Sequence, residues 1–155
     1  KVKSMSSIVT QVPTDEIKSF FSICSTIGAY IIFPSKKVEN KMTINGARGI
    51  NRSIKDRFDL TLECIRRFYI NEFTPLSDTL KRYSTFFSLF QDFQGYVEFF
   101  FLQDLVTKNY SSIKFYIPFN GFDNNPLPNN VEEYQLYKKN MIDFVTARNQ
   151  RLLNQ

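Results

Sequence analysis

The chain has 155 residues, a net charge of +5, 43% hydrophobic residues and 23% charged residues, which is the composition of an ordinary globular domain with enough chain for a core. It contains no histidine, and its two cysteines form no CxxC pair. A zinc site and a nucleophile or acid/base pair built on histidine are therefore excluded or strongly disfavoured.

Aromatic residues are frequent, with 17 Phe and 8 Tyr. Each buried Phe contributes about 2 kcal/mol to folding, so a core built on rings is expected. The 20 basic residues are dispersed along the chain, whereas nucleic-acid binders cluster them on one face. A nucleic acid is thus the less favoured partner, although it stays open.

The first third of the chain predicts one helix and two strands. A helix is expected over Thr14–Ile27, because its apolar residues recur at helical spacing. Ala29–Phe33 has the pattern of a buried strand, and Met42–Ile44 that of a second, short strand. Asn45-Gly46 predicts a tight turn, since both residues tolerate positive φ.

The rest of the chain predicts four helices and one strand. A second helix covers Ser53–Tyr69, and a third begins at Thr74-Pro75 and carries an apolar stripe as far as Phe90. A fourth is expected over Tyr96–Val106. The alternation in Ile113–Phe119 predicts an edge strand, and a final helix follows over Asn130–Leu152, opened by a capping box.

These elements predict an α+β fold that is mainly α. About five helices would pack around an aromatic-rich core with a small two- to three-stranded sheet. No repeat or linker interrupts the chain, so residues 1–155 are expected to form a single globular domain. Both cysteines, Cys24 and Cys64, fall among apolar residues of predicted helices and are expected to be reduced and buried. The longest apolar run is too short and too charged to span a membrane.

The second helix carries the most informative polar pattern. At 100° per residue it is apolar on nearly every side, which leaves one narrow strip of acids and arginines. Such a strip is either a solvent-facing ladder of ion pairs or the polar wall of a cleft. Its members are Asp56, Asp59, Glu63, Arg66 and Arg67.

The turn before that helix favours an anion site. Residues 45–49 (NGARG) can expose backbone N–H groups, and the forked side chains of Arg48, Arg52 and Arg57 suit phosphate or carboxylate. No Walker A or GxGxxG pattern is present, and Asp56 and Asp59 would also answer the helix dipole without a ligand.

The fourth predicted helix places two carboxylates among apolar residues. Glu98 and Asp104 share no polar face, so we expect both to be at least partly buried and to need a partner. Arg148 lies in the apolar stripe of the last helix. The prediction is a structural buried ion pair between Arg148 and one of these acids.

Five segments of the chain resemble an uncharacterised bacterial family of unknown function. The resemblance implies a cytoplasmic bacterial or phage-like setting and a chain that is the C-terminal part of a longer protein. It assigns no activity, cofactor or catalytic residue. The segments are Thr26–Pro34 (TIGAYIIFP), Met42–Gly49 (MTINGARG), Asp56–Tyr69 (DRFDLTLECIRRFY), Gly95–Val106 (GYVEFFFLQDLV) and Phe144–Arg151 (FVTARNQR).

Two hypotheses follow. The first is a domain that binds an anionic small molecule or nucleotide, bearing phosphate or carboxylate; in an enzymatic version, Glu63 or Asp59 would be the general base. The second is a non-enzymatic interaction or structural module of a larger protein or oligomer, which would use exposed aromatic residues and the Asn/Pro loop Asn120–Asn130 to dock a protein partner or a second copy. Neither implies a metal. The expected ligand-binding residues are Asn45, Arg48, Asn51, Arg52 and Arg66.

Overall fold

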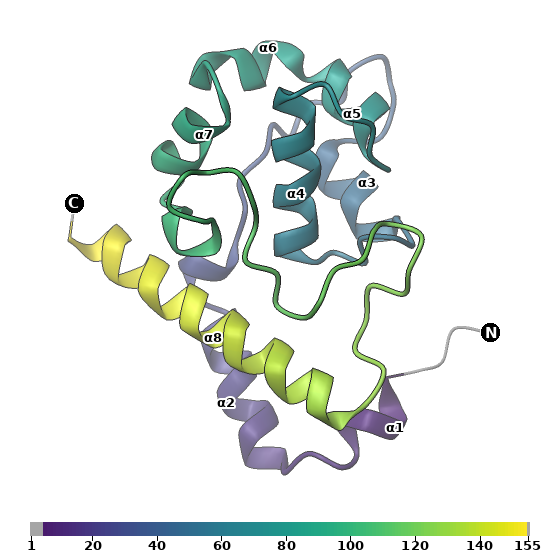
Figure 1. Cartoon of the computed structure of the whole chain (residues 1–155), viewed down its shortest axis with the longest axis vertical. Coiled ribbons are helices and arrows are strands. Elements are labelled where there is room, and N and C mark those ends of the chain that lie inside the picture. The colour runs from purple at the N-terminus through teal and green to yellow at the C-terminus, as the bar shows by residue number, and fades with distance from the viewer. Residues whose placement is uncertain (1–4, 155) are drawn as a thin grey trace. The chain divides into compact units, whose positions relative to one another are not determined.

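The structure is a computed structural model that describes residues 5–154. These residues fall into two compact units (Figure 1). Unit 1 takes the described chain up to Tyr30, Tyr116–Pro118 and the residues from Leu127 onward, and unit 2 takes Ile31–Phe115 and Phe119–Pro126. The single-domain interpretation of residues 1–155 stays a prediction.

Unit 1 is built on one long helix, α8 (Val131–Leu153), which packs along α2 (Thr14–Cys24) and also contacts α1 (Ser6–Val9) and η1 (Ile27–Ala29). The Asn130 side chain accepts a hydrogen bond from the Glu133 N–H (2.8 Å), and the Glu133 carboxylate accepts one from the Asn129 N–H (2.8 Å). The expected final helix and its cap at Asn130 are confirmed: the bond to Asn130 satisfies an N–H group that the first helical turn leaves open, and the bond from Asn129 ties the preceding residue to that turn.

A polar joint fastens η1 to α8 within unit 1. Asn149 accepts a hydrogen bond from the Gly28 N–H (2.8 Å) and donates one to the Thr26 hydroxyl (2.7 Å). The buried Arg148 donates from one nitrogen to the carbonyls of Gly28 (3.0 Å) and Tyr30 (2.7 Å). A side chain at Gly28 would place its Cβ 2.7 Å from the Val145 carbonyl oxygen. Glycine at this position therefore permits the close approach.

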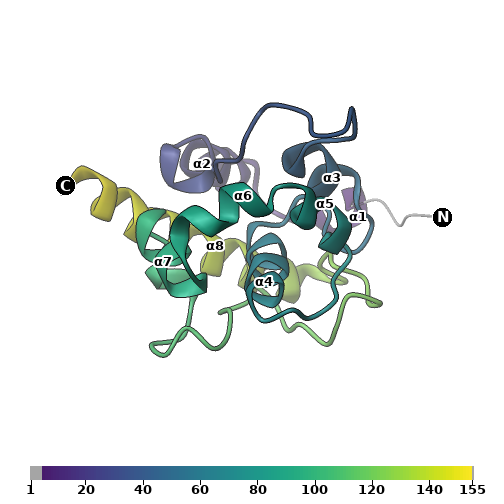
Figure 2. The same ribbon diagram turned by 90° about the horizontal axis from the view of Figure 1, so that it is seen from above.

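Unit 2 surrounds one helix, α4 (Phe58–Tyr69), whose residues from Phe58 to Ile65 are all buried. Figure 2 looks along α4 and shows other helices of the unit beside it; α5 and α7 contact it directly. The remaining elements are α3 (Ile44–Ile50), α5 (Ser77–Arg82), α6 (Ser84–Phe87), η2 (Ser88–Phe90), α7 (Phe93–Phe99) and η3 (Gln103–Leu105).

Aromatic rings form the core of unit 2 beside α4. The fully buried Tyr96 ring lies 4.8 Å from Phe100, 5.2 Å from Phe90 and 5.8 Å from Phe87, measured between centroids and in tilted or edge-on geometry. Such arrangements add to the free energy of burial. The expected aromatic-rich core is confirmed.

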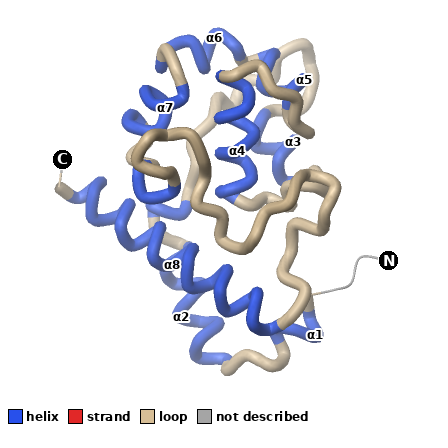
Figure 3. The backbone as a smooth tube through the Cα atoms, in the orientation of Figure 1, coloured by secondary structure: helices blue, strands red, loops and turns tan. Residues whose placement is uncertain are grey.

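The expected sheet is wrong. Within the described residues the chain is helical and irregular, and the only strand pairing is a single antiparallel bridge between Val106 and Ile113 (Figure 3). Ala29–Phe33 and residues 114–119 have no strand partner, and Ile113 pairs only through that bridge. A strand needs a neighbour to satisfy its backbone, and these segments are instead held by side chains; the Asn140 amide, for example, donates to the Tyr116 carbonyl (2.9 Å).

The segment expected to be a strand and a turn, 42–46, begins α3 instead. Ile44, Asn45 and Gly46 are helical, and the Thr43 hydroxyl accepts a hydrogen bond from the Gly46 N–H (3.2 Å). Asn-Gly favours a hairpin turn only between strands that pair. Here the threonine cap offers the backbone a helical alternative.

Several helix boundaries also differ from expectation. The second helix begins at Phe58 rather than Ser53, because Lys55 and Asp56 take positive φ in a turn. The third is split into α5, α6 and η2. The fourth ends at Phe99, where Phe101 (φ +56°) reverses the chain and the Leu102 N–H bonds back to the Val97 carbonyl (2.9 Å).

Replacement of Gly95 by Ala tests the packing of α7. A Cβ at this position would lie 2.1 Å from the Phe90 carbonyl oxygen, so backbone must move. We expect Gly95→Ala to lower the free energy of unfolding by about 3 kcal/mol or more. Gly49→Ala is the control, because its Cβ meets nothing within 4 Å; it should be stabilising by about 0.5–1 kcal/mol. If urea denaturation showed the same change in the free energy of unfolding for Gly95→Ala and Gly49→Ala, this packing would be contradicted.

Candidate functional site

The first turn of α4 holds a buried ion pair. Arg57 (4% exposed) donates from Nε to Asp59 Oδ1 (3.0 Å) and pairs through Nη2 with Oδ2, while Asp59 is fully buried. Arg57 also donates to the Pro126 carbonyl, and Asp59 accepts from the Leu60 N–H (3.0 Å). The forked geometry and the extra bonds are what a buried charge pair requires to be stable.

Arg48 lies beside this pair and is equally engaged. Its Nε donates to the Thr61 hydroxyl (2.9 Å), Nη2 donates to the Asp56 carbonyl (2.7 Å), and Nη1 lies 2.5 Å from the Asp56 carboxylate. Nη1 also approaches the Asn45 amide oxygen (3.5 Å). The predicted residues Asn45 and Arg48 are thus brought together. Because these contacts use the whole guanidinium fork, they favour a structural role for Arg48.

The other two predicted residues of this region, Asn51 and Arg52, lie in different surroundings. Asn51 accepts from the Ser53 N–H (2.9 Å) and donates to the Pro75 carbonyl (3.4 Å), so it braces the turn that precedes α4. Arg52 is exposed and makes no ion pair or side-chain hydrogen bond with another described residue. It is the one predicted cation on α3 and the following turn that an external anion can reach.

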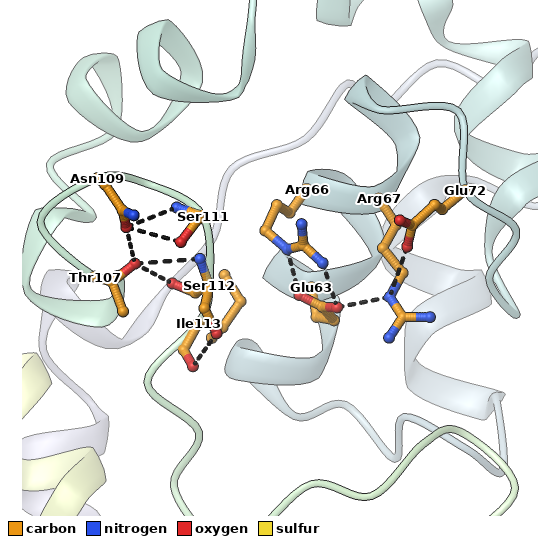
Figure 4. A network of polar contacts seen from close by, with 9 residues as sticks. All are labelled: Glu63, Arg66, Arg67, Glu72, Thr107, Asn109, Ser111, Ser112 and Ile113. Carbon is orange, nitrogen blue, oxygen red and sulfur yellow. Dashed lines mark hydrogen bonds and ion pairs between the residues drawn. The ribbon is translucent and has the colours of Figure 1, made fainter.

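The middle and end of α4 carry a second network (Figure 4). Glu63, 3% exposed, is gripped by Arg66 through two bonds (2.8 and 2.9 Å) and by Arg67 (2.6 Å). The hydrogen bond to Glu63 raises the pKa of Arg66. Arg67 also lies 3.7 Å from Glu72 and stacks over the Phe122 ring at 5.3 Å. The predicted polar strip is therefore a set of internal ion pairs.

Figure 4 also shows a separate polar turn in unit 2. The Thr107 hydroxyl donates to Asn109 (2.8 Å) and accepts from the Ser112 N–H (3.2 Å), while the Ser111 hydroxyl donates to Asn109 (2.8 Å). These bonds close the loop that the bridge between Val106 and Ile113 begins. These hydrogen bonds join residues of the turn to one another.

The remaining predicted site residues have varied surroundings. Glu98, expected to be partly buried, is exposed and accepts hydrogen bonds from Gln94 (2.8 Å) and Tyr110 (2.9 Å). Asp104 is half-buried and Arg148 is buried. The pairing of Arg148 with one of these acids stays a prediction. A catalytic role for Glu63 or Asp59 also stays a prediction, and their burial and pairing favour a structural role.

Sequence reasoning missed a hollow of about 210 Å³ at the end of α4. Asn71 (φ +58°) reverses the chain there, with its N–H bonded to the Phe68 carbonyl and the Glu72 N–H bonded to that of Arg67. This Asn after an aromatic helix end is the signal that could have indicated the turn. The lining residues are Phe68, Asn71, Glu72, Phe73, Ser77 and Lys81.

Phe73 stands out in this hollow because its side chain is 81% exposed. Its neighbour along the chain, Thr74, is buried and donates its N–H to the Ser77 hydroxyl (2.8 Å). The wall of the hollow is thus fixed on both sides of Phe73. The Phe73 ring itself is exposed to solvent.

Among the described residues no group of histidine, cysteine or acidic side chains is placed to hold a metal ion. In the same part of the chain, no helix combines the length and the hydrophobicity that crossing a membrane would require.

The buried Arg57–Asp59 pair makes a testable prediction. Asp59→Leu leaves the Arg57 charge buried without its partner, so the free energy of unfolding should fall by about 3–5 kcal/mol. Arg57→Met combined with Asp59→Leu should recover most of this loss. Asp143→Ala, which breaks an exposed pair with Lys139, is the control and should change stability by less than about 0.5 kcal/mol. A double variant as unstable as the single one would contradict a pairing role.

Cys64 makes a second prediction. Burial raises the pKa of its thiol to about 12, against an ordinary value near 9. The folded thiol stays neutral while the unfolded one ionises, so the thiol's contribution to stability is present below about pH 8.5 and is lost as pH rises toward 12. Thiol labelling at pH 8 should modify Cys24, which is half-buried, well before Cys64.

A Cys24→Ala variant is the control for this labelling. Its remaining thiol should react only at the rate of unfolding, and fully in urea. Rapid labelling of Cys64 in folded protein would overturn the assignment.

Comparison with known proteins adds the family and nothing finer. No curated protein and no solved structure gives a match to the chain. The model of one protein family matches residues 1–152, which is nearly all of the chain, and that family is described only as one of unknown function. The bacterial setting stays a prediction, but the resemblance to a family of unknown function is confirmed: the chain belongs to the family of unknown function DUF6994.

Proposed function

We propose that the chain is a non-enzymatic interaction module. One contrast carries the proposal: the acids and arginines that could perform chemistry are turned inward, whereas large apolar side chains are turned outward. Asp59 and Glu63, the candidate bases, are at most 3% exposed and are held by arginines. A base that no substrate can reach does not support catalysis.

The exposed apolar side chains of unit 2 support a docking role. Four of its large side chains are at least 64% exposed, two of which are phenylalanine. Single exposed apolar residues are normal, but an exposed aromatic residue beside a hollow, as Phe73 is, is typical of the anchors that dominate protein interfaces. The four are Ile50, Phe73, Leu89 and Phe99.

An anionic small molecule or nucleotide is the second candidate ligand. Arg52 favours it, because this exposed cation follows α3 and has no ion-pair partner among the described residues. One arginine without convergent donors is a weak site compared with a phosphate-binding loop. A cytoplasmic setting belongs to both candidates as a proposal.

The first test replaces the four exposed residues of unit 2 by serine together. Because they are exposed, the melting temperature should stay within about 3 °C of the wild type. Affinity capture from the source cells, read by mass spectrometry, and light scattering for self-association should show a partner or a second copy with the wild type and its loss with the variant. Identical behaviour of a folded variant would overturn the interaction module.

A thermal-shift screen separates the second candidate. The wild type and Arg52→Ala are heated with nucleotides, phosphosugars and carboxylic acids. The interaction module predicts no shift with any of them. A ligand at 100 times its dissociation constant adds about 2.7 kcal/mol, so a stabilisation seen in the wild type and absent from Arg52→Ala would establish the anionic ligand instead.

A further inference from the structure

The hollow at the end of α4 has the size of one aromatic ring. Its volume is about 210 Å³, and an apolar cavity of about 150 Å³ is known to hold benzene. Phe68 and Phe73 supply its apolar walls, and ring faces and edges favour another ring in tilted contact. Pockets for drug-sized ligands are larger, at about 300–1,000 Å³.

The charges at the rim select an acidic neighbour for that ring. Glu72 lies 3.7 Å from Arg67 and forms an ion pair with it. Lys81 is exposed and makes no ion pair or side-chain hydrogen bond with another described residue. Of the two charged groups in the lining, Lys81 is thus the one without an ion-pair partner among the described residues, and it favours a carboxylate on whatever enters.

The walls of the hollow are held in place before anything binds. The turn at Asn71 is fixed by two backbone hydrogen bonds to the end of α4, of 3.2 and 2.9 Å. On the other side, the Ser77 hydroxyl accepts the Thr74 N–H. A rigid wall lowers the entropy lost on binding. By contrast Phe99, 64% exposed, lies outside this lining.

We propose that the hollow receives an aromatic side chain of a partner protein, from a segment in which an acidic residue adjoins the aromatic one. Phe68 and Phe73 contact the inserted ring, and Lys81 pairs with the carboxylate. This inference rests on the proposed interaction module and names the chemistry of one of its docking points.

The test uses defined peptides and the full chain labelled with ¹⁵N. Acetyl-Phe-Asp-amide should shift the amide signals of residues around the turn, Asn71 to Phe73, and of Ser77, with a dissociation constant of about 1 mM, as suits one inserted side chain. Acetyl-Ala-Asp-amide, which lacks the ring, and acetyl-Phe-Lys-amide, which reverses the charge, should bind at least about fivefold more weakly.

Two variants make the assignment specific. Phe73→Ser should weaken binding of the Phe-Asp peptide by about tenfold, whereas the matched Phe99→Ser should leave it unchanged. Lys81→Glu should reverse the preference, so that the Phe-Lys peptide binds better than the Phe-Asp peptide. Unchanged peptide preference in a folded Lys81→Glu protein would overturn the role of the lysine.

The outcomes also separate this inference from the proposed function. Absence of shifts around the hollow, or equal shifts with the Ala-Asp peptide, overturns the inference that the hollow binds an aromatic side chain. The proposed interaction module still stands if the four-serine variant loses its partner. Phenylacetate is a further probe. If it binds as tightly as the Phe-Asp peptide, the site is one for a small aromatic acid, and the inference of a protein partner fails.

Discussion

Burial of α4 on every side is the constraint on which unit 2 depends. A helix placed at the centre of a small unit must bury whatever its sequence puts on each face, including Asp59, Thr61 and Glu63. Buried charges are tolerated only when they are paired and hydrogen-bonded. The surrounding arginines supply the ion-pair partners: Arg57 pairs with Asp59, and Arg66 and Arg67 pair with Glu63.

The same demand explains why the chain is rich in arginine around this helix. A planar guanidinium can form two parallel hydrogen bonds to one carboxylate, and it keeps its charge at any physiological pH. A lysine ammonium lacks this forked geometry. Arg48 extends the arrangement to α3 by bonding Thr61 and Asp56 at once. A polar pattern that resembles a ligand site in the sequence is thus accounted for by internal pairing.

In unit 1 a buried arginine is satisfied by backbone carbonyls instead of carboxylates. Arg148 is buried, and its guanidinium bonds the carbonyls of Gly28 and Tyr30, while Asn149 holds the N–H of Gly28. A segment that forms no sheet and little helix has backbone groups to satisfy, and these side chains of α8 supply the partners. Two of the segments that carry the family resemblance, around residues 26–34 and 144–151, meet in this joint.

The sequence by itself determined the helical content, the aromatic core, the cap at Asn130 and the absence of histidine chemistry, because each depends on local periodicity or on composition. Only the tertiary structure decided the rest. Ile113–Phe119 has the alternation of a strand but pairs only at Ile113, through a single bridge. The Asn-Gly pair, which predicts a turn, instead lies in a helix capped by Thr43. The arginine pairs on α4 are local, and their spacing suggested an ion-pair ladder; that they are buried rather than solvated, and that a hollow lies beside Phe73, depends on how the surrounding elements pack, which the spacing of residues does not specify.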